Sequence, residues 1–388
     1  MPRIFISTGE VSGDLQGSLL IEALYRQTSK HDVDLEIIAL GGDRMKAAGA
    51  TLLENTSAIG SVGLLETLPF ILPTVLLQRR VEAYLRDHPP DVVVLIDYFG
   101  ANVRIARFIR RQFPGVPMVY YISPQEWVWS VSLRNTQRIV EMSDRLLAIF
   151  PEEARYYSKH GANVTWLGHP LLDRVEHWPT RAEARNQLGI DADQLAIALI
   201  PASRRQEIKY LMPVMFAAAQ QIQAQRPEVR FWIPLSLETY RPAIEAAIRD
   251  YGLQATIVNI SEQAIAAADL ALTKSGTVNL ELALMNVPQV VVYRVSPVTA
   301  WIATTILKFS IPFMSPANIV LMESIVPEFL QDAATPEAIA QTALELLQPE
   351  HRQSLTQDYQ RMRDALGQPG ACDRAALEIL ACGLIIEH

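Results

Sequence analysis

Short apolar segments alternate with helical patterns along almost the whole chain, and this alternation restricts the fold more than any other feature of the sequence. In the first half, the apolar segments predict strands at Arg3–Ser7, Leu35–Leu40, Val92–Ile96, Met118–Ile122, Arg145–Ala148 and Val164–Leu167. The second half repeats the pattern at Ala196–Ile200, Arg230–Ile233, Thr256–Val258, Leu270–Leu272 and Gln289–Tyr293. Apolar strands that alternate with helices are typical of parallel sheets covered on both faces. The sequence therefore predicts an α/β fold with two doubly wound, Rossmann-like domains that face a cleft.

The length and the order of the segments divide the chain into domains. A chain of 388 residues exceeds one typical core, so two domains of roughly 150–200 residues are expected. Gly168, His169 and Pro170 close the first alternation, and a new helical pattern begins at Thr180. We expect a first domain over residues 1–172, a second over 173–350, and C-terminal helices over 351–388 that could pack back on the first domain.

Composition excludes several classes of protein. Hydrophobic residues make up 49% of the chain and charged residues 20%, which is a globular composition. The net charge of −8 disfavours nucleic acid as the main partner, because phosphate binding needs a broad basic surface. Cys372 and Cys382 lack a histidine pattern of zinc-ligand spacing, and Met1 leads directly into a strand with no secretory signal. We therefore expect a cytoplasmic protein without a bound metal.

The most apolar segment, Ile59–Leu77, is interrupted by Glu66, Pro69 and Pro73. It is too short and too broken to cross a bilayer, which requires about 20 apolar residues in succession. Two interpretations remain open: an element that lies on a membrane surface, with Arg79 and Arg80 as a basic flank, or a buried helix pair of the first domain.

A second basic feature lies on the helix expected over Ala101–Gln112. Its apolar stripe consists of Ile105, Phe108 and Ile109, and its opposite face carries Arg104, Arg107 and Arg111. Such an arginine face is usually only solvent-exposed, but anionic lipid headgroups would be a natural partner for it.

Residues 273–281, Thr-Lys-Ser-Gly-Thr-Val-Asn-Leu-Glu, join the strand at Leu270–Leu272 to a helix. Backbone amides at a helix N-terminus, together with the Ser275 and Thr277 hydroxyls, can hold phosphate. Glu281 lies one helical turn further and could accept both hydroxyls of a ribose. The alternative is that Ser275 or Thr277 is an ordinary N-cap and that Glu281 is solvated.

Two other strand ends carry candidate residues. Arg204 follows the strand Ala196–Ile200, and its planar guanidinium could clamp a diphosphate, the alternative being a surface ion pair. Asp97 follows the strand Val92–Ile96, and its carboxylate could take a proton from an attacking hydroxyl, the alternative being a cap for the next helix. The spacing Asp191-Ala192-Asp193 imitates a metal motif, but it precedes a strand, and we interpret it as a solvated loop.

The first strand ends in Ser7-Thr8-Gly9-Glu10-Val11-Ser12-Gly13-Asp14. Two glycines allow the backbone to turn tightly and to approach a ligand. The spacing is not that of a dinucleotide fingerprint, and the chain has no P-loop. Asp14 could bind an acceptor or could favour a helix N-terminus.

With these residues in view, the chain resembles the lipid-A-disaccharide synthases, a family of inverting glycosyltransferases with the GT-B fold. The landmarks extend over nearly the whole length: Gly9–Asp14, Gly41–Met45, Gly63–Glu66, Ile96-Asp97, Tyr121–Pro124 with Trp127 and Trp129, Leu167–Pro170, Ser203-Arg204, Ser275–Thr277 with Glu281, Tyr293-Arg294 and Pro316–Asn318.

The resemblance implies transfer of 2,3-diacylglucosamine from its UDP conjugate to the 6-hydroxyl of 2,3-diacylglucosamine 1-phosphate (lipid X), which gives a β-1,6-linked disaccharide 1-phosphate and UDP. It implies a metal-independent enzyme without a cofactor, at the cytoplasmic face of the inner membrane, and it leaves a homodimer open. By the same resemblance, Asp97 is the general base and Arg204 stabilises the leaving UDP. The implied UDP-sugar residues are Ser203, Ser275, Gly276, Thr277, Glu281, Arg294 and Asn318. The implied acceptor residues are Glu10, Ser12, Gly13, Asp14 and Ser123.

The chain departs from the family pattern mainly in the first domain. Tyr-Phe-Gly-Ala-Asn follows Asp97 where the family commonly has Ala-Pro-Asp-Phe-Asn, and Ala202 replaces a glycine. Pro151-Glu152-Glu153 stands in place of Pro-Phe-Glu. Three alternatives therefore stay open: a different lipid acceptor, an enzyme like UDP-N-acetylglucosamine 2-epimerase, and a membrane-associated protein that binds UDP without catalysis.

Overall fold

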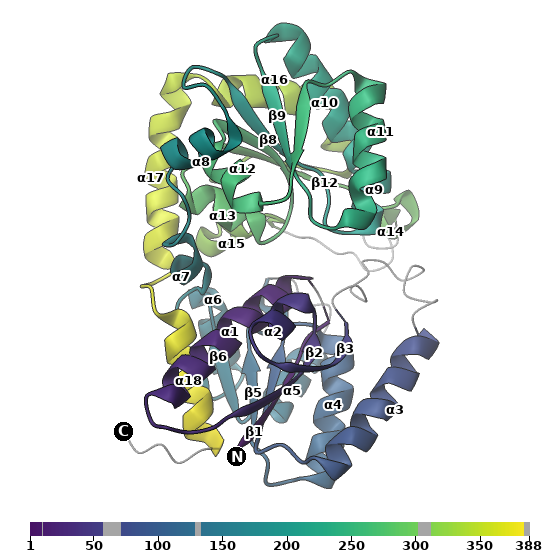
Figure 1. Cartoon of the computed structure of the whole chain (residues 1–388), viewed down its shortest axis with the longest axis vertical. Helices are drawn as coiled ribbons and strands as arrows, with labels where there is room; N and C mark the ends of the chain where they lie inside the picture. The colour runs from purple at the N-terminus through teal and green to yellow at the C-terminus, as the bar shows by residue number, and fades with distance from the viewer. Residues whose placement is uncertain (10, 57–70, 129–132, 302–311, 384–388) are drawn as a thin grey trace. The chain divides into compact units, whose positions relative to one another are not determined.

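The computed structural model describes residues 1–9, 11–56, 71–128, 133–301 and 312–383 (Figure 1). The chain forms two compact units: unit 1 comprises Met1–Asp173 and Leu366–His388, and unit 2 comprises Arg174–Ala365. The chain therefore enters unit 2 after Asp173 and returns to unit 1 after Ala365. The helices expected together over 351–388 are divided, with α17 (Pro349–Ala365) in unit 2 and α18 (Ala371–Gly383) in unit 1.

Unit 1 contains a parallel sheet with the strand order β3-β2-β1-β4-β5-β6-β7. Its strands are β1 (Arg3–Ser7), β2 (Glu36–Gly41), β3 (Thr51–Asn55), β4 (Val92–Ile96), β5 (Met118–Tyr121), β6 (Arg145–Ala148) and β7 (Val164–Trp166). Its helices are α1 (Val11–Ser29), α2 (Asp43–Ala47), α3 (Ile71–Asp87), α4 (Phe99–Gln112), α5 (Leu133–Met142), α6 (Pro151–Lys159) and α18, with a 3-10 turn at Gln125–Trp127; α7 (Leu171–Val175) spans the passage to unit 2. The strand order reverses between β1 and β4.

Unit 2 contains a second parallel sheet with the order β10-β9-β8-β11-β12-β13. Its strands are β8 (Ala196–Ile200), β9 (Arg230–Pro234), β10 (Ala255–Val258), β11 (Leu270–Lys274), β12 (Gln289–Tyr293) and β13 (Glu328–Leu330). Its helices are α8 (Arg181–Leu188), α9 (Arg205–Tyr210), α10 (Met212–Gln225), α11 (Arg241–Tyr251), α12 (Ser261–Ala267), α13 (Val278–Leu284), α14 (Pro297–Trp301), α15 (Pro316–Leu321), α16 (Pro336–Leu346) and α17. The order reverses between β8 and β11.

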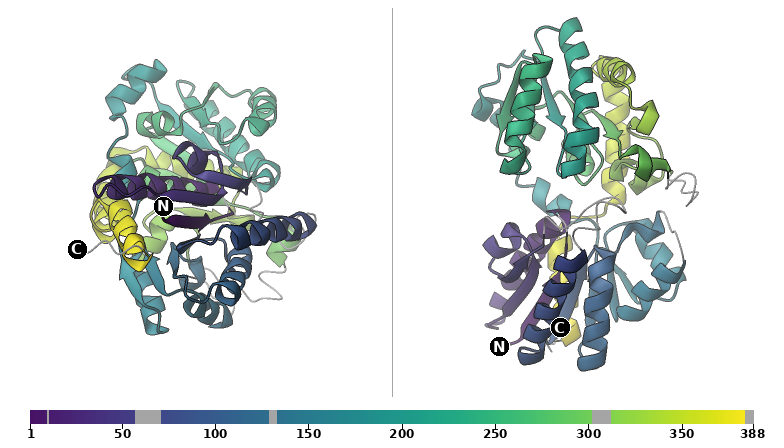
Figure 2. Two further views of the ribbon diagram at one scale, coloured as in Figure 1. Left: turned by 60° about the horizontal axis from the view of Figure 1, so that its bottom comes forward. Right: turned by 90° about the vertical axis from the view of Figure 1, so that its right-hand side faces the viewer.

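Helices cover both faces of each sheet (Figure 2), and this explains why the central strands are apolar throughout. Every residue of β4 and of β8 is buried. On α4, Ile105, Phe108 and Ile109 are buried, so the predicted core stripe is confirmed. The expected α/β class with two doubly wound parallel sheets is also confirmed.

Some elements differ from the predictions. The single helix expected over Glu207–Gln225 is two helices, α9 and α10, because Pro213 in the first turn of α10 cannot donate the backbone hydrogen bond that would continue the first helix. Strands β3 and β13 were not predicted. The residues of β3 are half-buried or exposed, and β13 has three residues, so neither shows an apolar run.

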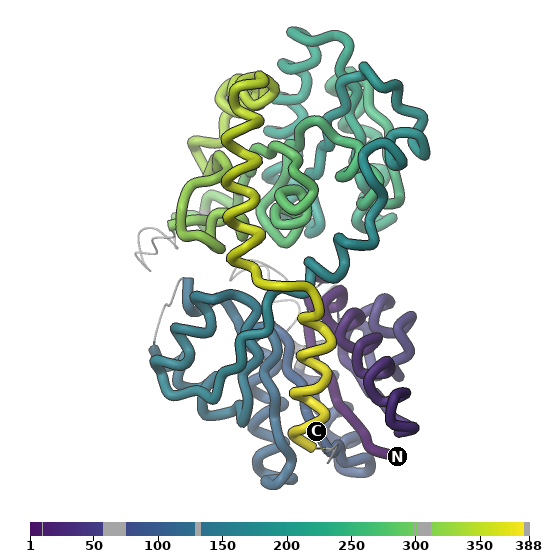
Figure 3. The backbone as a smooth tube through the Cα atoms, turned by 90° about the vertical axis from the view of Figure 1, so that its left-hand side faces the viewer, coloured from purple at the N-terminus to yellow at the C-terminus, as the bar shows by residue number. Residues whose placement is uncertain are grey.

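Helix α18 returns the chain to unit 1 and packs against α1 (Figure 3). Arg26 of α1 pairs with Asp373 at 2.8 Å, and Arg145 of β6 pairs with Glu378 at 2.5 Å. The N-terminus of α18 is capped by Asp173, whose carboxylate accepts the backbone N–H groups of Gly370 and Cys372. The final described helix is therefore part of the packing of the first sheet.

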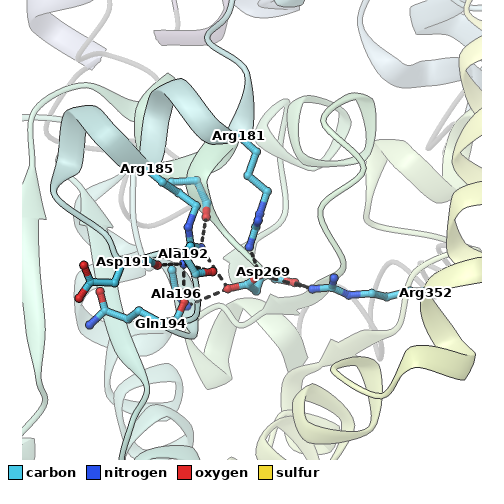
Figure 4. A network of polar contacts seen from close by, with 9 residues as sticks. Arg181, Arg185, Asp191, Ala192, Gln194, Ala196, Asp269 and Arg352 are labelled. Atoms are coloured by element: carbon cyan, nitrogen blue, oxygen red, sulfur yellow. Dashed lines mark hydrogen bonds and ion pairs between the residues drawn. The ribbon is translucent and has the colours of Figure 1, made fainter.

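A buried carboxylate organises the amino edge of the sheet in unit 2 (Figure 4). Asp269 accepts hydrogen bonds from Arg181 at 2.5 Å, from Arg185 at 3.4 Å and from the backbone N–H of Ala196 at 2.9 Å. Arg352 of α17 completes the group at 3.5 Å. The group joins α8, α17 and the starts of β8 and β11. The exposed loop Asp191–Asp193 lies at this same edge, away from the carboxyl ends of the strands.

Candidate active site

The carboxyl edge of unit 2 gathers most of the residues predicted to bind UDP-sugar. Arg204 follows β8, Lys274 ends β11, and Arg294 follows β12. Strands β8, β11 and β12 are neighbours, and the order reverses between β8 and β11. Ligands of open parallel sheets bind outside the carboxyl ends of the strands at such a reversal. Two cationic side chains therefore come from the two strands that flank the reversal.

The turn from β11 to α13 is fixed by side chains beneath it. Asn279 is fully buried, accepts the backbone N–H of Gly276 at 2.9 Å and donates to the carbonyl oxygen of Lys274 at 3.0 Å. The Asn279 amide also donates to the side chain of Gln289 at 3.1 Å. Gly276 has a φ of 153°, which side-chain-bearing residues rarely adopt. The turn therefore has one defined conformation and requires glycine.

The N-cap alternative holds for Thr277 by position only. Thr277 occupies the N-cap position of α13 but makes no capping hydrogen bond with its side chain. The Ser275 hydroxyl donates to the carbonyl oxygen of Met314 at 2.6 Å, across to the segment before α15. The motif therefore connects two segments that lie far apart in the sequence.

Lys274 lies within the motif and at the carboxyl edge of the sheet, but it was not among the predicted site residues. Its ammonium donates to the carbonyl oxygen of Ser275 at 3.3 Å. A Cβ atom at Gly276 would stand 2.9 Å from the Lys274 Nζ, so the glycine leaves room for the ammonium at the turn. The signal in the sequence was a lysine directly before Ser-Gly-Thr at the end of an apolar strand.

Glu281 is buried rather than solvated and is paired with a residue that was also missed. Its Oε1 atom accepts from Arg174, whose other terminal nitrogen donates to Glu262 at the start of α12. The guanidinium of Arg174 lies 5.0 Å from the ring centroid of Trp178. Arg174 and Glu281 are separated by 107 residues, so no local pattern could have connected them.

The backbone after β8 is held by Glu207 of α9. Its Oε2 atom accepts the backbone N–H groups of Ser203 at 2.6 Å and of Arg204 at 3.0 Å. Burial raises the pKa of the Tyr293 phenol at the end of β12, and the positive charge of Arg204 opposes that shift.

The remaining predicted UDP-sugar residues differ in their environment. Asn318 is fully buried, and its amide accepts from the backbone N–H groups of Ile325 and Val326 and donates to Glu328 at 2.6 Å. It holds the segment that leads into β13. Arg294 is half-buried at the end of β12.

In unit 1, Asp97 directly follows β4 at the reversal of that sheet. Asp97 and Tyr98 have φ angles of 45° and 30°, both in the left-handed region. The Asp97 carbonyl oxygen accepts from the Tyr120 hydroxyl at 2.7 Å and from the Asn102 amide at 3.0 Å. The N-cap position of α4 is occupied by Tyr98, directly after Asp97. Unusual backbone held by several partners is common at functional sites.

The segment after β1 is used largely for internal contacts. Asp14 is buried, and its carboxylate accepts the backbone N–H groups of Gly42 at 2.7 Å and of Met45 at 3.1 Å, which caps α2. A Cβ atom at Gly13 would clash with the Thr8 side chain. Ser12 is half-buried. Glu10 lies outside the described residues.

Ser123 belongs to a buried polar group. Its backbone N–H and its hydroxyl donate to Oε1 of Glu153 at 2.8 and 2.6 Å. The other oxygen of Glu153 accepts the backbone N–H groups of Ile149 and Phe150. Burial raises the pKa of Glu153, and these four donors oppose the shift. Glu153 therefore organises the turn before α6. It directly follows Glu152, which departs from the family pattern.

His169 lies in the Gly-His-Pro segment beside this group. It is buried, and its Nδ1 atom accepts the backbone N–H of Leu171 at 3.2 Å. The ring of Phe150 lies edge-on at 5.1 Å between centroids. Burial lowers the pKa of His169 to about 3. The imidazole is therefore neutral and has a packing role.

Helices α3 and α4 carry an arginine surface, which we define as Arg79, Arg80, Arg86, Arg104, Arg107 and Arg111. All six side chains are exposed, and α3 packs against α4. Of the apolar segment predicted at Ile59–Leu77, residues 59–70 lie outside the described residues. No helix in the described part of the chain combines the length and the apolar character needed to span a bilayer.

Comparison with known proteins identifies relatives over the full length. The family model described as lipid-A-disaccharide synthetase matches residues 4–381. A protein of Gloeothece citriformis named lipid-A-disaccharide synthase is 60% identical over 380 residues, covering 97% of this chain and 99% of that protein. A Synechocystis protein of the same name is 55% identical over 382 residues, covering 97% of each chain.

Solved structures share the architecture at low identity. A Staphylococcus aureus MnaA structure with UDP has a TM-score of 0.67 at 14% identity, covering 100% of this chain and 98% of that one. The calicheamicin glycosyltransferase CalG4 has a TM-score of 0.57 at 17% identity, covering 100% of each chain. At these identities the likeness shows the fold alone.

Proposed function

The chain belongs to the lipid-A-disaccharide synthase family, and from this membership we propose that it transfers diacylglucosamine from UDP-diacylglucosamine to the 6-hydroxyl of 2,3-diacylglucosamine 1-phosphate. The enzyme is a glycosyltransferase of lipid A biosynthesis, and the epimerase and non-catalytic alternatives are not favoured. The observation that carries the substrate assignment is the carboxyl edge of unit 2. There Arg204 and Lys274 flank the reversal of the strand order, and Glu281 stands one helical turn after Thr277.

The diphosphate of UDP would lie between Arg204 and Lys274. The fixed turn at Ser275, Gly276 and Thr277 would support it, and Glu281 would accept the ribose hydroxyls. A nucleoside diphosphate leaves with two or more negative charges, and preorganised cations at the leaving oxygen lower the barrier because they need no reorganisation during the reaction. The two side chains would supply that charge, which supports a reaction independent of metal.

Asp97 would act as general base. Its carboxylate takes the proton of the acceptor 6-hydroxyl, the hydroxyl oxygen forms a bond to C1 of the donor sugar, and the bond from C1 to the β-phosphate oxygen breaks with its electron pair leaving on UDP. Attack from the face opposite to UDP inverts C1 and gives the β-linkage. The fixed backbone of Asp97 supports this role. Its main chain is hydrogen-bonded to Ile122, Tyr120 and Asn102, and the ring of the next residue, Tyr98, lies against Gly9.

Both substrates carry acyl chains, so the enzyme must meet them at a lipid surface. The arginine surface on α3 and α4 would contact anionic headgroups at the cytoplasmic face of the membrane, each exposed arginine contributing about 1 kcal/mol near such a surface. Peripheral association of this kind requires no spanning helix. The structure contains one chain, so the homodimer stays a prediction.

The test is product analysis by mass spectrometry in detergent micelles, with both acylated substrates and with EDTA present. We expect a disaccharide 1-phosphate and an equal amount of UDP. Tight binding of UDP-diacylglucosamine without formation of a disaccharide would mean that unit 1 takes a different acceptor, and absence of both would remove the proposal.

A further inference from the structure

Arg174 stands at the point where the chain enters unit 2 and contacts two carboxylates of that unit. It donates through one terminal nitrogen to Glu281 and through the other to Glu262. The exposed fractions of the Arg174 and Glu281 side chains are 13% and 10%, whereas that of Glu262 is 28%. The pair between Arg174 and Glu281 is therefore largely removed from water, where the geometry of a charged hydrogen bond matters more than at the surface.

The guanidinium is itself held in place. It lies 5.0 Å from the ring centroid of Trp178, and Trp178 packs against an apolar cluster of unit 2 that includes Ile265 of α12 and Leu282 of α13. A planar guanidinium fixed on an aromatic face and bonded at both ends has little rotational freedom. Arg174 can therefore impose one orientation on the carboxylate of Glu281.

We propose that Arg174 is a positioning residue for the nucleotide site, which orients Glu281 so that its carboxylate accepts the 2′- and 3′-hydroxyls of the UDP ribose. This inference rests on the proposed function, because it requires that Glu281 meets the ribose. A carboxylate offers about four acceptor positions, so a carboxylate that accepts from Arg174 can accept from ribose hydroxyls as well. Hydrogen bonds to a carboxylate are roughly twice as strong as neutral ones, so a carboxylate held in one orientation by Arg174 would be a strong acceptor for the ribose hydroxyls.

The experiment measures binding of UDP and of 2′,3′-dideoxy-UDP by calorimetry to the full chain. Because the dideoxy nucleotide lacks the hydroxyls that Glu281 would bind, the ratio of the two dissociation constants isolates the ribose contact. For the wild type we expect UDP to bind at least about tenfold more tightly, since each hydrogen bond to a charged group contributes about 1.5–3 kcal/mol.

Arg174→Gln should weaken binding of UDP about tenfold and leave binding of dideoxy-UDP nearly unchanged, so that the ratio falls toward one. Arg174→Lys keeps the positive charge but lacks the two-pronged guanidinium, so it should retain part of the ratio of the two dissociation constants. This second variant keeps the inference testable if the glutamine variant does not fold. Arg361→Gln is the matched control, because it breaks an exposed ion pair with Glu323 at 2.8 Å elsewhere in unit 2. That variant should bind both nucleotides as the wild type does.

The outcomes separate the inference from the proposed function. If the Arg174 variants weaken both nucleotides equally, or neither, Arg174 is merely structural and the inference is overturned. If the wild type does not distinguish the two nucleotides but binds UDP tightly, Glu281 does not meet the ribose, and both that part of the proposed function and the inference fail. If the wild type binds neither nucleotide, the proposed UDP site itself is wrong.

Discussion

Replacement of His169 by glutamine should remove a defined part of the acid sensitivity of unit 1. His169 is buried against Phe150, accepts a backbone hydrogen bond through Nδ1 and has a pKa lowered by burial to about 3. In the unfolded chain its pKa is about 6.5. Between these two values the unfolded state binds a proton that the folded state does not bind, so acid favours unfolding.

The magnitude follows from proton linkage. Stability rises with pH wherever the unfolded state binds more protons, so the contribution of His169 is complete above pH 6.5 and is lost as the pH falls below it. With RT of about 0.59 kcal/mol and an unfolded pKa of about 6.5, the change from pH 7 to pH 5 lowers the free energy of unfolding by about 2 kcal/mol for this one group. Below pH 3 the loss stops, because both states are then protonated.

The assay is urea unfolding of the full chain at pH 7 and pH 5. Hydrogen exchange of peptides from β4 and β5 serves as the readout, so that the unfolding of unit 1 is observed separately. The variant His169→Gln should lose about 2 kcal/mol less than the wild type between the two pH values. The exposed His31 provides a control, and His31→Gln should behave like the wild type. Equal losses in the wild type and in His169→Gln would refute the reasoning, since they would mean that His169 titrates normally in the folded state.

Three further predictions concern the site. Asp97→Asn should lower kcat by about 10²–10⁴-fold, because an amide cannot take the proton, while calorimetry should show unchanged affinity for UDP; substantial turnover by this variant would exclude Asp97 as the base. Lys274→Ala should weaken UDP about tenfold or more but leave uridine binding unaltered, because the ammonium would act on the diphosphate alone; an equal effect on both ligands in a fluorescence titration would contradict a phosphate role. Glu153→Gln should lower the free energy of unfolding of unit 1 by about 1–3 kcal/mol in urea, since the new NH₂ group would face N–H donors; the neighbouring half-buried Glu152, which pairs with Arg155 at 2.8 Å, provides the control Glu152→Gln, and equal stability of the two variants would disprove the network.

The positions of site residues could be predicted where they follow from the sheet rule. Asp97, Arg204 and the 275–277 turn each follow a strand that is buried throughout or nearly so, and parallel strands bring such positions to the carboxyl edge of their own sheet, in unit 1 for Asp97 and in unit 2 for the other two. The roles of Asp14 and Ser123 were harder to predict, because their partners are backbone amides on other elements and a carboxylate 30 residues away. Sequence patterns show the period of one element and do not show which element packs against it.

Arg174 and Glu153 were missed for the same physical reason. Each makes its main contacts through tertiary packing. The sequence singled out Glu153 only as part of Pro151-Glu152-Glu153 and did not single out Arg174. Strand β3 was missed because an edge strand needs no continuous apolar run, since one side of it faces solvent. The homologous motifs predicted the fold and the enzyme family, whereas the supporting contacts around each motif required the three-dimensional arrangement.

The return of α18 to unit 1 has a consequence for synthesis of the protein on the ribosome. Unit 2 is one continuous segment, but unit 1 is built from the first part of the chain and from residues translated after all of unit 2. At about 5–20 residues per second, Arg174–Ala365 takes on the order of 10–40 s to translate. During that time the surface of α1 that α18 later covers is open to water and to chaperones. A lesion or bulky fusion at α18 would therefore impair maturation of the N-terminal sheet and leave unit 2 able to fold.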